Sequence, residues 1–457
     1  MVRKMALNAL KGLGWLALAV LLLALAWLAS NNRWVDARSD AVPSALQVPA
    51  VTLPDERNGF FALLGLDAPE GADPAQTGRQ RWASGELGQA APDRLRWPQP
   101  KPGDAAASWN CRAADDDCTA RWREQTLALQ TLMKQHATLG RRCEALADPG
   151  FVMDEPLRQP RAEIMKPADQ YVVLAILPTS GLVQCARWLR LQAVLAQQRV
   201  DATALQVALQ RSQRLVNGLL SGSRSLTTTL IAWRIAEDHW RMLAALSARQ
   251  PALTAELIGL AAPLPAEARD ASRWIVSEAF SGRQIIRELG LSWREGGLES
   301  PLENGMERAL NRAGFGFMPR ATQQLADQHW LSALEAARAG PLALIGWPLP
   351  QKERLFDFAW YNTVGHLLMD VGWSSYADYA RRHADLLLHH QAVLLALQGA
   401  SCPPALRAVW LADQAMDEPM RARIRLDGTQ QLVVSPWSRQ DASAKPTVYP
   451  IAQLRDS

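Results

Sequence analysis

The chain has 457 residues, 48% of them hydrophobic and 21% charged, which is enough for a large core in two or three domains. The first 34 positions account for the whole excess of 49 basic over 45 acidic residues, because they contain no acidic residue and four basic ones: Arg3, Lys4, Lys11 and Arg33. The remaining chain is formally neutral. It therefore lacks the basic excess with which nucleic-acid-binding proteins displace counterions, and we exclude nucleic acid as a partner.

Residues 12–30 form an uncharged apolar stretch directly behind three basic residues. As a helix rising about 1.5 Å per residue, this stretch is roughly 28 Å long, close to the thickness of a bilayer's hydrocarbon core. Basic residues on the short side predict that residues 1–11 are a cytoplasmic tail and that the rest is exported. We predict a single-pass signal-anchor in a bacterial inner membrane, with the bulk of the chain in the periplasm.

A cleavable signal peptide is the alternative, because Ala24-Leu25-Ala26 matches the small-x-small pattern of a cleavage site. The apolar stretch continues past this site through Trp27 and Leu28. Trp15 and Trp27 also resemble the aromatic belts found at the two membrane interfaces, and both features favour the uncleaved anchor.

Residues 31–118 are expected to form an extended, Pro-rich arm, since nine prolines lie between Ala41 and Cys118. Within this arm, residues 58–66 are apolar enough that exposing them to water is costly. We predict that this segment docks on the following domain. Phe60 and Phe61, its aromatic residues, are also candidates for a partner surface.

Five cysteines suit an oxidising compartment. If 119–142 is one helix, Cys118 and Cys143 lie roughly 37 Å apart, too far for a disulfide. Cys111 with Cys118, and Cys143 with Cys185, are then the possible pairs, and Cys402 is left over. Alternatively, several cysteines are simply buried apolar residues. A zinc site is not expected, because no CxxC motif is present.

Long helical patterns dominate residues 119–400, which we predict to be a repeat-like helical array, either a bundle or an irregular α-solenoid. Residues 292–319 lack such a pattern and predict a surface loop. The helices are expected at 121–145, 181–199, 201–220, 223–249, 251–262, 265–289, 321–338, 351–370 and 374–400. In the C-terminal segment, 401–457, alternation around Asp427-Gly428 predicts a β-hairpin over 423–434. The fold class is therefore mainly α.

Catalytic, metal and cofactor sites are not predicted. His383, His389 and His390 share one expected helix but lack the spacing of a metal-binding HExxH motif. Asp385 and His389, four residues apart, could pair with each other.

One element suggests glycan chemistry. Ser277-Glu278-Ala279-Phe280 resembles the Glu-Ser-x-Phe/Tyr element of lytic transglycosylases, which cleave peptidoglycan with one glutamate. The resemblance implies Glu278 as that acid, although the serine that should follow the glutamate is absent.

Tryptophan is unusually frequent, with eighteen residues against eight Phe and five Tyr. Most tryptophans at helical spacing fill a core, whereas Trp293, Trp347 and Trp373 lie near loops or helix ends and are candidates for a partner surface. The eleven-residue cytoplasmic tail is too short for a signalling domain, whereas a helical array presents an extended binding surface. Together with the anchor and the absence of a catalytic signature, these features predict an adaptor or scaffold that binds a protein partner in an envelope assembly. The alternative is a peptidoglycan hydrolase or lytic transglycosylase, which a deep cleft with a buried, raised-pKa carboxylate would favour.

Overall fold

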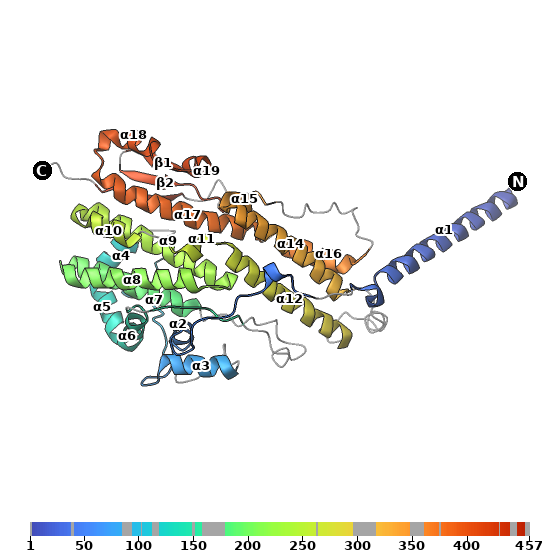
Figure 1. Cartoon of the computed structure of the whole chain (residues 1–457), viewed down its shortest axis with the longest axis horizontal. Coiled ribbons are helices and arrows are strands. Elements are labelled where there is room, and N and C mark those ends of the chain that lie inside the picture. The colour runs from blue at the N-terminus through green and yellow to red at the C-terminus, as the bar shows by residue number, and fades with distance from the viewer. Residues whose placement is uncertain are drawn as a thin grey trace.

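The computed structural model describes residues 2–37, 41–84, 94–101, 103–111, 118–148, 151–157, 179–261, 264–295, 317–347, 361–373, 376–428, 430–438 and 446–452. Within them the chain is mainly α-helical, with one small sheet near the C-terminus. The long helix α1 (Val2–Ser30) projects away from a layered array of helices, as Figure 1 shows. Residues 351–360 of the helix predicted at 351–370, and residues 296–316 of the loop predicted at 292–319, lie outside the described residues. The two ends of that predicted loop are helical, because α12 continues to Glu295 and α14 begins at Pro319.

Helix α1 carries the apolar stretch. Residues Lys11–Ser30 are long and apolar enough to cross a membrane, with a mean hydropathy of 2.3 and no residue buried in the structure. A helix this apolar and this exposed is costly in water, so α1 is a signal sequence or an anchor. Together with two disulfides, it points to a secreted or envelope protein.

The region between α1 and Cys118 is less extended than its prolines predict. It contains α2 (Gly59–Leu64) and α3 (Pro74–Ser84), which begin at capping residues Asn58 and Asp73. The backbones of α2 and α3 are in direct contact at Gly78, where a Cβ atom would lie only 1.8 Å from the carbonyl oxygen of Phe61. A proline-rich segment thus becomes a compact helix pair that packs on the array.

Two disulfides join the next elements. Cys111 pairs with Cys118 at the start of α4 (Cys118–Glu124), and Cys143 pairs with Cys185, linking α6 to α7. These are the pairings that the spacing allows, and Cys402 remains a free thiol. The long helix expected over 121–145 is instead broken near Gln125 and His136 into three: α4, α5 (Thr126–Gln135) and α6 (Ala137–Leu146).

Long helices form the array. They pack in sequential and long-range pairs, α7 on α8, α8 on α9, α9 on α17 and α12 on α14. Buried tryptophans, among them Trp240, Trp274 and Trp330, fill the space between them. The bounds are α7 Thr179–Gln198, α8 Ala202–Gly222, α9 Leu226–Arg249, α10 Thr254–Ala261, α11 Ala266–Arg269, α12 Ser272–Glu295, α14 Pro319–Ala339, α15 Pro341–Ile345, α16 Thr363–Trp373 and α17 Tyr376–Gln398.

The C-terminal segment adds two short helices and three strands: α18 Arg407–Ala412, α19 Glu418–Arg421, β1 Ile424–Asp427, β2 Gln431–Val434 and β3 Thr447–Pro450. Strands β1 and β2 form the predicted hairpin, with Ile424 opposite Val434. The hairpin is not alone, because β3 pairs antiparallel with β2 and completes a three-stranded sheet. Tyr449 of β3 is fully buried and contacts His389 of α17, which joins the sheet to the array.

The turn between α7 and α8 contains a strained residue. Val200 has a φ of 57°, in the left-handed region where a β-branched side chain is disfavoured. The N–H of Val200 donates to the carbonyl oxygen of Gln197, and the N–H of Asp201 donates to the carbonyl oxygen of Ala196. This is the hydrogen-bond pattern of a Schellman C-cap. Glycine is the preferred residue at this position.

We expect Val200→Gly to stabilise the fold by about 1 kcal/mol, because the left-handed conformation costs an L-residue roughly that much. Chemical unfolding of the detergent-solubilised chain measures the change. Val200→Ala is the matched control and should recover only part of the gain, because alanine keeps a Cβ. A destabilised Val200→Gly variant would contradict this explanation of the turn.

Candidate partner-binding groove

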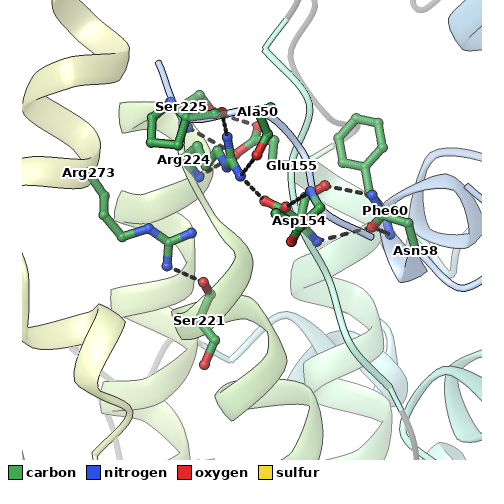
Figure 2. A network of polar contacts seen from close by, with 11 residues as sticks. Ala50, Asn58, Phe60, Asp154, Glu155, Ser221, Arg224, Ser225 and Arg273 are labelled. Carbon is green, nitrogen blue, oxygen red and sulfur yellow. Dashed lines mark hydrogen bonds and ion pairs between the residues drawn. The ribbon is translucent and has the colours of Figure 1, made fainter. Parts of the chain in front are cut away.

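A buried arginine holds the arm against the array. The guanidinium of Arg224, in the turn between α8 and α9, donates to the carbonyl oxygens of Pro49 (2.5 Å) and Ala50 (3.4 Å). It also forms an ion pair with Asp154 at 2.5 Å. Figure 2 shows Arg224 at the centre of this network, reaching from the helices to both segments. One side chain therefore joins three parts of the chain that are distant in sequence.

Asp154 and Asn58 extend the clamp toward α2. The side-chain amide of Asn58 donates to the backbone oxygen of Asp154 (2.7 Å), and its oxygen accepts from the backbone N–H of Asp154 (3.0 Å). The same oxygen caps α2 through the N–H of Phe60 (Figure 2). The Asp154 carboxylate also accepts from the N–H of Thr52. The arm is thus fastened along residues 49–60.

Glu155 secures the helix end that carries Arg224. Its carboxylate accepts four hydrogen bonds, from the N–H groups of Arg224 and Ser225 and from the hydroxyls of Ser225 and Thr228. The two backbone N–H groups precede the first residue of α9 and so have no acceptor within the helix. Burial raises the pKa of Glu155, and the four hydrogen bonds oppose this rise. The role of this carboxylate is capping, because its bonds all go to the helix start.

The clamped arm forms one wall of a groove. A cavity of about 630 Å³ lies between arm residues 42–48, residues 279–291 of α12 and the first turns of α14. This volume falls within the range of ligand-binding pockets. Gln47 and Val48 also line an adjoining cavity of about 380 Å³ beside the N-terminal half of α12. The walls of the larger cavity are mainly apolar, with Val42, Leu46, Val48, Ala279, Phe280, Ile286, Leu291 and Pro319.

Polar groups in this groove come from both helices. Arg283 of α12 pairs with Asp327 of α14, and Gln323 donates to the same carboxylate at 2.8 Å. The side-chain oxygens of Gln284 and Gln323 are buried and find no hydrogen-bond partner among the described residues. A buried acceptor without a donor is costly, and both glutamines belong to the lining of the groove. Arg287 and Arg320, both exposed, add positive charge to the lining.

None of the predicted partner-surface residues with a described side chain lines this groove. Phe60 and Phe61 are only 1% and 2% exposed and pack edge-to-face on Trp82 of α3. Trp347 is also buried and donates its indole N–H to Ser332. Phe60, Phe61 and Trp347 are therefore buried in the core and are not exposed to a partner. Their positions in the sequence did not indicate which elements would cover them. The side chains of Trp293 and Trp373 lie outside the described residues.

The histidines of α17 have structural partners. His383 and His390 contact the backbone oxygens of Ala268 and Ala261, at 3.0 and 3.1 Å, and burial lowers the pKa of both rings. Asp385 does not pair with His389; its carboxylate accepts from the N–H groups of Trp437 and Ser438. No group of three or more metal-binding side chains is found in the part of the chain that the structure describes.

Glu278 lies beside the groove but not in it. Its oxygens accept from the N–H of Leu226 and from the hydroxyl of Tyr376, at 3.3 and 3.2 Å. Burial raises the pKa of Glu278, and the nearby charge of Glu155 adds to the rise. Both oxygens are engaged at the junction of α9, α12 and α17, so this carboxylate has the surroundings of a structural group.

Comparison with protein-family models, with curated proteins and with solved structures finds no match to this chain. The groove therefore has to be interpreted from its own geometry.

We expect Arg224→Met to loosen the arm, because losing one partner of a buried ion pair leaves the Asp154 carboxylate uncompensated at a cost of about 3 kcal/mol. Trypsin should then cut faster at Arg57, an exposed residue inside the clamped stretch. Arg425→Met, at an exposed position of β1, is the matched control and should leave this cleavage unchanged. Equal cleavage rates in Arg224→Met and the native chain would contradict the clamp.

We expect Glu155→Gln to gain stability relative to the native chain as pH rises from 4 to 7. Burial raises the pKa of Glu155 above its ordinary value of 4.5, so the unfolded chain loses this proton first. The native free energy of unfolding therefore falls with rising pH, whereas glutamine does not titrate. Guanidinium unfolding at several pH values measures the difference.

Glu56→Gln, at an exposed position of the arm, is the control for removing a carboxylate. Glu155→Ala should cost about 2 kcal/mol at every pH, because it leaves backbone donors buried without an acceptor. A stability difference between Glu155→Gln and the native chain that is the same at pH 4 and pH 7 would count against the raised pKa.

Proposed function

We propose that this protein is a single-pass, membrane-anchored adaptor that faces the periplasm of a bacterial envelope and binds a protein partner in the groove. The observation that carries the proposal is the groove itself. It combines mainly apolar walls with exposed arginines, and its lining includes two glutamines whose side-chain oxygens have no donor among the described residues. An apolar peptide segment that contains an acidic residue is complementary to this groove, because its apolar side chains can pack on the walls and its acidic side chain can pair with arginine.

The position of the groove next to the apolar helix also supports an anchored adaptor. Asp36 lies six residues after the end of α1, and its carboxylate accepts from the N–H groups of Arg320 and Ala321, at 3.1 and 2.8 Å. These are the first N–H groups of α14, which carries one wall of the groove. A carboxylate at a helix N-terminus is stabilising, so α14 is held close to the end of α1.

The glycan-cleaving alternative has one observation in its favour. Asp327 lines the groove, and burial raises the pKa of its carboxyl group. Its two oxygens are engaged, however, one by Arg283 and the other by Gln323. A general acid needs a proton that it can deliver to a substrate atom, and this arrangement directs the carboxylate into the wall instead. The adaptor is therefore the better-supported function.

A photoreactive amino acid at Leu291, a half-exposed residue of the groove, tests the proposal in the native envelope. We expect a crosslink to a partner protein, through a segment that is apolar and contains an acidic residue. Arg287→Glu should reduce the crosslink about tenfold, because reversing a rim charge repels an acidic segment. The same photoreactive residue at Val409 of α18, and the Arg425→Glu variant, are the matched controls.

Recovery of only lipid or the chain itself at Leu291 would contradict the adaptor. So would peptidoglycan cleavage by the purified chain that is lost in Asp327→Asn.

A further inference from the structure

The end of α1 is bonded to the start of α16. The indole N–H of Trp27 donates to the hydroxyl of Thr363 at 3.1 Å, and the backbone N–H of Thr363 donates to the side-chain oxygen of Asn31 at 3.0 Å. Asn31 is buried in this joint. The hydroxyl of Tyr361 donates to the backbone oxygen of Val35. Helix α16 therefore begins at the level where the apolar stretch of α1 ends.

The residues around this joint expose large apolar side chains. Helix α16 is itself very apolar, since only His366 and Asp370 among its eleven residues can carry charge. Its Leu367 and Leu368 are 60% and 43% exposed. Across the joint, Trp34 is 85% exposed, with Val35 beside it half exposed. Large apolar side chains that are exposed on both sides of the joint mark a surface that a protein partner or a lipid phase covers.

The depth of these residues relative to α1 identifies the covering phase as the lipid interface. If residues 11–30 span the hydrocarbon core, the joint lies at its outer boundary, where a headgroup layer of about 5 to 7 Å begins. Leu367 and Leu368 follow Thr363 by four and five residues, so they lie at most about 6 and 7.5 Å further out, even if α16 runs straight away from the membrane. Trp34 and Tyr361 are aromatic residues of the kind enriched at this depth. The exposed leucines thus fall within the interfacial layer or at its outer limit.

We infer that the membrane-facing end of the array rests in the lipid interface through Leu367 and Leu368 of α16 together with Trp34 and Val35. This inference rests on the proposed anchoring of the chain by α1. The surface and the anchor then hold the array at two contacts. A single helix allows rotation and tilting, whereas a second lipid contact fixes the orientation of the groove relative to the membrane.

The test uses the full chain with Cys402→Ser, so that a single introduced cysteine can carry an environment-sensitive fluorophore. The labelled positions are Leu367→Cys, Leu368→Cys, Leu16→Cys in α1 and Val409→Cys in α18, which lies at the opposite end of the array from α1 (Figure 1). The chain is reconstituted in phosphatidylcholine vesicles that contain lipids with a nitroxide either near the headgroup or deep in the acyl chain.

We expect fluorophores at 367 and 368 to emit at shorter wavelength than the one at 409, and to lose about half of their emission to the shallow nitroxide. The fluorophore at 16 should respond to the deep nitroxide, and the one at 409 to neither. If 367 and 368 behave like 409 while 16 is quenched, the lipid contact is wrong and the anchor stands. If 16 is not quenched either, the anchor is wrong and both proposals fall.

Discussion

The clamp centred on Arg224 is the interaction on which the arrangement of the arm depends. It joins the arm, the segment around Asp154 and the turn between α8 and α9 through one guanidinium. Burying this charge costs desolvation energy that the ion pair with Asp154 offsets only in part. Its contribution is directional, because the donors of arginine reach carbonyl oxygens of the arm and the carboxylate at the same time. An apolar contact could hold the arm as firmly but would not fix its register.

Register matters because the arm is part of the groove. Leu46 and Val48 form one wall, and they immediately precede the carbonyl groups that Arg224 binds. A shift of one residue along the arm would exchange these apolar side chains for Gln47 and Pro49. Glu155 supports the same register from the other side, since it holds the start of α9 and with it the backbone of Arg224. The shape of the groove thus follows from polar contacts outside it.

The sequence predicts those parts of this structure that depend on local physics. The apolar stretch, the helix start at Asp201 and the turn at Asp427-Gly428 are all found, because capping and turn chemistry act within a few residues. The third strand and the burial of Phe60 depend on segments that are distant in sequence. The groove cannot be predicted from the sequence for the same reason. Gln284 and Gln323 lie on separate helices, and only the packing of α12 on α14 brings their amides to one cavity.

The groove and the lipid-facing surface share the same supports, and this connects the two proposals. Asp36 caps α14, while Asn31 and Trp27 bind the start of α16, so the segment that leaves α1 holds both helices. Helices α14 and α16 are also joined directly, since the hydroxyl of Thr322 donates to the side chain of Asn362 at 3.0 Å. Asn362 has a φ of 53°, a conformation that asparagine tolerates better than most residues, and it lies in the buried joint. A tilt of α1 would therefore be transmitted to one wall of the groove through hydrogen bonds rather than through a flexible linker. For an adaptor in a membrane, such a connection makes the orientation of the bound partner a property of the anchor as well as of the groove.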